Sequence, residues 1–81
     1  QLDALTTLQT ELEVLMLGGR RYPPNRVNEA EARVESLTFT VSDSRLRELL
    51  ELLASTRRGD PEWRDTYGNV MRRLGEVLRT T

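Results

Sequence analysis

Apolar residues recur at alternating spacings of three and four near the start of the chain. This spacing is the period of one face of an α-helix. Two glycines and then two prolines follow, and both residue types favour the end of a helix. The pattern predicts a helix over residues 2–17 and a loop over residues 18–25. The leucines that form the apolar stripe of this helix are Leu5, Leu8, Leu12 and Leu15.

Residues 26–42 carry two overlapping patterns. From Val27 to Leu37 the apolar positions have helical spacing within good helix-forming sequence. From Leu37 to Val41 apolar residues instead alternate with serine and threonine, which is typical of a half-buried strand. We therefore expect a helix over residues 26–37 followed by a short β-strand at residues 37–41.

The clearest amphipathic pattern lies over residues 44–56, where four leucines share one helix face and charged residues occupy the other. Asp43 or Ser44 can cap the first turn of this helix. A fourth helix is predicted over residues 61–79, because Asp60 and Pro61 form a strong start signal. Together the four patterns predict a mostly α fold, a small helical bundle in a single domain over residues 1–81.

Two glycines, Gly68 and Gly75, interrupt the last predicted helix seven residues apart, so they lie on nearly the same face. Each costs a helix about 1 kcal/mol relative to alanine. Either the helix tolerates them, or they allow a second helix to approach closely at this face. The sequence leaves both interpretations open.

The composition argues against catalysis. The 81 residues contain no cysteine, histidine or lysine, which removes disulfides, thiolate metal sites and the usual general base. A solvated helix face accounts for the carboxylates at Glu29, Glu31 and Glu35. We therefore expect no enzymatic activity, no cofactor, no metal site and no small-molecule substrate.

Net charge and hydropathy bear on location and partners. The formal net charge is −1, which provides no strong attraction to nucleic acid. No apolar run approaches the length of a membrane span, so we expect an intracellular, cytoplasmic protein. In the back half, arginines alternate along the sequence with acidic residues, which favours a solvated face with local ion pairs over a nucleic-acid-binding stripe.

The helical stripes favour binding to a protein partner or self-association. They can also form an ordinary internal core, and both interpretations stay open. Residues 1–19 hold three acidic and no basic residues, whereas residues 57–81 hold six arginines and four acidic residues. This polarity suits antiparallel packing of the first helix on the last, within one chain or between two. The expected contact residues are Leu5, Leu8, Leu12, Leu15 and Met16, with Trp63 and Tyr67 as aromatic anchors.

One stretch resembles a known family. LTFTVSDSRLRELLELLA, Leu37–Ala54, is similar to the strand and first helix of ribbon-helix-helix repressors, and Gly59 falls near the glycine of their inter-helix turn. The resemblance implies an intertwined dimer that inserts paired strands into the DNA major groove. A DNA-binding transcriptional repressor is therefore the alternative function. The residues that this alternative places against the bases are Ser36, Thr38 and Thr40.

Overall fold

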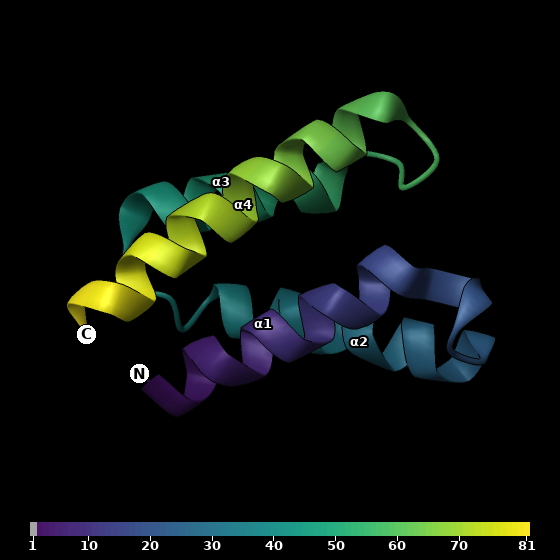
Figure 1. The fold of residues 1–81 in the computed structure, drawn as a ribbon, viewed down its shortest axis with the longest axis horizontal. Helices are drawn as coiled ribbons and strands as arrows, with labels where there is room; N and C mark the ends of the chain where they lie inside the picture. The colour runs from purple at the N-terminus through teal and green to yellow at the C-terminus, as the bar shows by residue number, and fades with distance from the viewer. Residues whose placement is uncertain (1) are drawn as a thin grey trace. The chain divides into compact units, whose positions relative to one another are not determined.

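The computed structural model describes residues 2–81 and divides the chain into two compact units (Figure 1). The first unit ends at Thr40 and the second begins at Val41. Each unit consists of two helices that pack side by side and run in opposite directions. The mostly α-helical fold with four α-helices is thus confirmed, whereas a single domain over the whole chain stays a prediction.

The first unit contains α1 (Leu2–Leu17), the short 3₁₀ helix η1 (Gly18–Arg20) and α2 (Pro24–Thr38). Gly18 follows α1 with a φ of +53°, a left-handed conformation that glycine adopts without steric cost. Its carbonyl accepts hydrogen bonds from the amides of Arg21 and Tyr22, at 3.2 and 3.1 Å. The predicted loop is therefore partly ordered as a turn of 3₁₀ helix.

α2 starts two residues earlier than predicted, at Pro24. Proline suits the first helical turn because it has no amide hydrogen to leave unbonded and its φ is already helical. The amides of Arg26 and Val27 then donate to the carbonyl of Pro23, at 3.0 and 3.2 Å. The proline pair thus begins this helix as well as ending the loop before it.

The short strand predicted at residues 37–41 is not formed, and residues 2–81 contain no strand in this structure. α2 continues through Thr38, and Phe39 and Thr40 form a turn. Their amides donate to the carbonyls of Ser36 and Leu37, at 3.3 and 2.9 Å. The strand prediction was wrong because a strand needs a neighbouring strand for its hydrogen bonds, whereas these residues find partners within their own helix end.

Both α-helices of the first unit contribute buried residues, and the two helices pack on each other. Glu11 is the one charged residue of α1 that is buried among the described residues. The buried apolar side chains recur along each helix at helical spacing, as in an amphipathic helix. They are Leu5, Leu8, Leu12, Val14, Leu15, Val27, Ala30 and Val34.

The second unit contains α3 (Ser44–Ser55) and α4 (Pro61–Thr80). Asp43 caps α3, since its Oδ1 accepts a hydrogen bond from the amide of Leu46 at 2.8 Å. Asp60 occupies the corresponding position before α4 but makes no side-chain cap; its carbonyl accepts from the amide of Trp63 at 3.0 Å. The buried apolar side chains of this unit are Val41, Leu46, Leu49, Leu50, Leu53, Trp63, Val70 and Leu74.

Across residues 2–81, none of the helices combines the length and the apolar character that crossing a membrane requires.

Candidate functional site

The leucines expected to contact a partner are core residues in this structure. Leu8 and Leu12 are fully buried, Leu5 is 2% exposed and Leu15 is 7% exposed. Met16, on the edge of the same stripe, is half-buried. A partner helix would therefore reach only Met16 among these five residues without a rearrangement of the chain.

The two expected aromatic anchors lie one turn apart on α4 and stack on each other. The ring centroids of Trp63 and Tyr67 are 5.3 Å apart, and the ring planes meet at 24°. Trp63 is buried, whereas Tyr67 is half-buried. The stack joins successive turns of one helix, so it supports α4 and leaves only part of Tyr67 accessible.

The residues expected to read DNA lie at the end of α2 and in the turn after it. Ser36 and Thr40 are exposed, but Thr38 is buried. The hydroxyl of Thr38 donates to the carbonyl of Val34 at 2.7 Å, and that of Thr40 donates to the carbonyl of Leu37 at 2.8 Å. In this structure the three residues do not form the strand face that base contacts would require.

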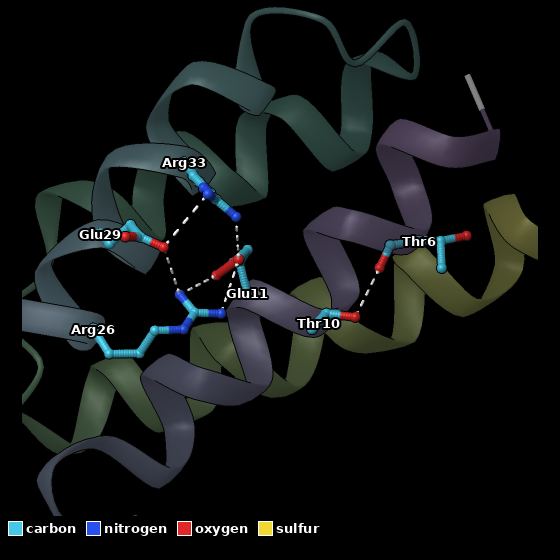
Figure 2. A network of polar contacts seen from close by, with 6 residues as sticks. All are labelled: Thr6, Thr10, Glu11, Arg26, Glu29 and Arg33. Carbon is cyan, nitrogen blue, oxygen red and sulfur yellow. Dashed lines mark hydrogen bonds and ion pairs between the residues drawn. The ribbon is translucent and has the colours of Figure 1, made fainter. Parts of the chain in front are cut away.

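A buried carboxylate links the two helices of the first unit (Figure 2). Glu11 of α1 has a side chain only 3% exposed, and two arginines of α2 reach it. Arg26 donates through Nη1 to Oε2 at 2.8 Å and through Nη2 to Oε1 at 3.0 Å. Arg33 donates through Nη1 to Oε1 at 3.3 Å. The bidentate contact with Arg26 fixes the orientation of the Glu11 carboxylate and also neutralises its charge.

Glu29 completes this network from the α2 side. Its Oε1 lies 3.5 Å from Nη1 of Arg26 and 3.4 Å from Nη2 of Arg33. Two carboxylates therefore face two guanidinium groups, so the formal charge of the network is zero. The hydrogen bond from Arg26 is the main reason that the pKa of Glu11 lies below its ordinary value of 4.5, although burial opposes this shift.

The sequence contained a signal for this network that the stripe pattern concealed. Glu11 stands between Leu8 and Leu12 on the apolar face of α1. Arg26 and Arg33 are seven residues apart in the next helix, hence on one side of it. A carboxylate on an apolar face, followed by arginines at this spacing, indicates a tie between helices but does not determine which arginines make it.

The second unit contains a similar tie between the start of α3 and the later turns of α4. Arg73 donates through Nε to Oδ1 of Asp43 at 3.0 Å and through Nη2 to Oδ2. Arg73 also donates to Oε1 of Glu76 at 3.2 Å. The hydrogen bond from Arg73, followed by the amide of Leu46, holds the pKa of Asp43 below its ordinary value of 3.8. The same contacts raise the pKa of Arg73.

These two networks are structural in character. In each, an arginine binds the carboxylate through two nitrogens, which leaves little of the carboxylate available to act as a base. Within the described part of the chain, no group of three or more acidic residues could hold a metal ion. The arrangement therefore orients the neighbouring helices within each unit.

Arginines and acidic residues alternate along the sequence of α4, but most of the arginines lie on one side of the helix. From Arg64 to Arg79, six residues fall within a sector of about 100° around the helix axis, given 3.6 residues per turn. The acidic residues Glu62, Asp65 and Glu76 fall outside this sector, and Asp65 lies nearest its border. We call this sector the basic flank of α4, and it consists of Arg64, Gly68, Met71, Arg72, Gly75 and Arg79.

The exposed side of α1 has the opposite charge. α1 contains no basic residue, and its one buried carboxylate is neutralised by arginines of α2. We call its exposed side the outer stripe of α1, and it consists of Leu2, Thr6, Thr10, Glu13 and Leu17. The sequence already indicated Gly68, Gly75 and the opposite charges of the first and last helices. It did not indicate these two full sets of residues, whose members are separated along the chain and join only on a helix.

In comparisons with known proteins, no family model, no curated protein and no solved structure matches this chain.

Proposed function

We propose that the chain is a non-catalytic protein–protein interaction module that associates with a partner helix or with another copy through its amphipathic helices. The observation that carries this proposal is that leucines lie exposed on helices whose other apolar residues are largely buried, in a chain of only 81 residues. A chain of this length buries only about 60–65% of its unfolded surface, so its stability margin is small unless disulfides, a metal or a partner support it. The sequence contains no cysteine for a disulfide.

Exposed apolar side chains on regular helices support the same function. Leu2 and Leu52 are each 53% exposed, and Leu17 is 42% exposed. Each belongs to a helix whose other apolar residues are largely covered. Covering such leucines contributes about 25 cal/mol per Å² of apolar area, from which the cost of lost rigid-body freedom is subtracted.

Sedimentation equilibrium of the purified chain over a wide concentration range tests this function. We expect an average mass above that of one chain which rises with concentration, and a helical content that rises with it. A chain that stays monomeric at every concentration, while fully helical and resistant to denaturant, would contradict the proposal. Such a result would mean that the chain needs no further apolar surface for its stability.

A further inference from the structure

The basic flank of α4 is a surface without a partner in the described chain. Arg64, Arg72 and Arg79 are exposed, and none of them forms an ion pair within residues 2–81. Arg73, by contrast, lies on the other side of the helix, where it binds Asp43 and Glu76. The three exposed arginines therefore give this flank positive charge, and the nearest acidic side chain of the helix is Asp65 at its border.

The helix surface between these arginines leaves room for a second helix to approach closely. A Cβ atom added at Gly68 or at Gly75 would meet no other group within 4 Å. Met71, between the two glycines, is half-buried and presents an apolar side chain at the same flank. Small residues around an apolar one are what a second helix needs in order to pack closely.

The outer stripe of α1 has matching properties. Its only charged member, Glu13, is exposed and forms no ion pair among the described residues. Asp3, at the border of the stripe, is also exposed and also forms no ion pair among the described residues. The hydroxyl of Thr6 donates to the carbonyl of Leu2 at 2.9 Å. The hydroxyl of Thr10 donates to the carbonyl of Thr6 at 3.2 Å (Figure 2). Because α1 itself satisfies these donors, a partner would cover the stripe with little loss of polar contacts to water.

The two surfaces also agree in length and register. Leu2 to Leu17 and Arg64 to Arg79 each contain sixteen residues, and their ends are about 22 Å apart along the helix. In an antiparallel arrangement with these ends aligned, Glu13 lies beside Gly68, between Arg64 and Arg72. The same register places Thr6 opposite Gly75, Thr10 opposite Met71, and Asp3 next to Arg79.

We infer that the outer stripe of α1 in one copy of the chain packs antiparallel on the basic flank of α4 in a second copy. This inference rests on the proposed function and names its partner. A two-fold dimer uses the seam twice, because each copy supplies one α1 and one α4. Complementary charge selects the register, and the covered leucines, Met71 and the arginine stems contribute the apolar area.

Charge reversal across the seam tests the inference by sedimentation equilibrium. We expect Glu13→Arg to weaken dimerisation about tenfold, and Arg64→Glu with Arg72→Glu to do the same, since each places like charges in contact. Combining all three changes should restore the dissociation constant to near that of the wild type. The matched control is Glu35→Arg, which makes the same charge change at an exposed residue of α2 outside the stripe.

A second pair of variants separates docking from folding. Gly68→Gln and Gly75→Gln replace poor helix formers with a good one, so each monomer should unfold at the same or higher denaturant concentration. Their side chains also occupy the space that the second helix needs, so we expect weaker dimerisation by about tenfold. Dimerisation as strong as that of the wild type would overturn the antiparallel seam.

The remaining outcomes each have a definite meaning. If the wild type dimerises but Glu13→Arg weakens it no more than Glu35→Arg does, the seam is wrong while the proposed function stands. A wild type that stays monomeric at every concentration would contradict the seam, and one that is also fully helical and resistant to denaturant would contradict the proposed function as well. If Glu13→Arg leaves dimerisation unaffected, the seam is wrong whatever the change does to the stability of the monomer. Salt-dependent binding of a monomer to duplex DNA, lost in Arg64→Glu with Arg72→Glu, would assign the flank to nucleic acid instead.

Discussion

Glu11 is a charged side chain in a position that the helix pattern assigns to the core. Its neighbours on the face, Leu8 and Leu12, are fully buried. Burial of a carboxylate is costly unless good hydrogen bonds compensate it, and replacement by an apolar residue can be neutral. Arg26 and Arg33 supply those bonds, and because they lie on α2 they also define how α2 aligns with α1.

The loss of stability caused by a substitution at Glu11 should depend more on the polarity of the new side chain than on its size. Glu11→Gln leaves a buried amide facing two guanidinium groups that cannot accept its hydrogen bonds, so we expect a loss of about 1–3 kcal/mol in the free energy of unfolding. Glu11→Met should cost less, because both arginines are partly exposed and can turn to water. Urea unfolding of both variants measures the difference.

The matched control is Glu13→Gln, an exposed residue half a turn away, which should change stability by less than about 0.5 kcal/mol. A Glu11→Met variant that is less stable than Glu11→Gln would contradict this account of the buried network.

At the scale of the elements, helix ends account for much of the order in this chain. Gly18 terminates α1, Pro24 begins α2, and Asp43 caps α3. Asp43 has a second role, because the oxygen that accepts from the amide of Leu46 also accepts from Arg73 of α4. The start of α3 is thereby tied to the helix that follows it.

The two roles of Asp43 can be separated by substitution. Asn caps a helix about as well as Asp, so Asp43→Asn should lose only the ion pair with Arg73, whereas Asp43→Ala should lose the cap as well. We expect Asp43→Ala to be the less stable variant by about 1 kcal/mol, the usual value of a cap. Thermal and urea unfolding of both proteins measure this. Equal losses in the two variants would show that the cap contributes nothing.

Prediction from the sequence succeeded where the signal was local and failed where it was not. The helices over residues 2–17, 44–56 and 61–79 agree with α1, α3 and α4 to within one residue at each end. The strand predicted at residues 37–41 was wrong because an alternation of apolar and polar residues over five positions also occurs at the end of a helix. Which state such a segment adopts depends on whether a strand is available to pair with it.

For the molecule as a whole, the candidate interaction surfaces could not be found from the apolar stripes. The sequence left open whether Leu5, Leu8, Leu12 and Leu15 contact a partner or form the core, and these side chains are buried in this structure. The surfaces that remain exposed are the outer stripe of α1, which carries exposed leucines, and the basic flank of α4, which carries arginines without an ion pair among the described residues. A stripe pattern indicates which residues leave water but not which neighbour covers them.

Stability should fall in acid, and both units should contribute. The pKa values of Glu11 and Asp43 are lowered in the folded chain, so the unfolded chain binds more protons as the pH falls through the ordinary range of these groups. Their contribution is therefore fully present above about pH 5 and is lost as the pH falls through the folded pKa values. Urea unfolding between about pH 7 and about pH 3 measures the loss.

The control for this prediction is the double variant Glu11→Gln with Asp43→Asn, which should show a shallower dependence of stability on pH. Parallel curves for the wild type and the double variant would mean that other groups cause the acid sensitivity.

The sequence by itself determined the four helices and most of their ends. The signals for this are the spacing of the leucines, the glycine pair and the proline pair. Each acts on the backbone within a few residues, so its effect does not depend on the rest of the chain. The tertiary structure alone decided that the leucine stripe of α1 is core, that Glu11 meets Arg26 and Arg33, and that Arg64, Arg72 and Arg79 stay unpaired within the described residues. These outcomes depend on which side chains from distant parts of the sequence come into contact, and no local pattern contains that information.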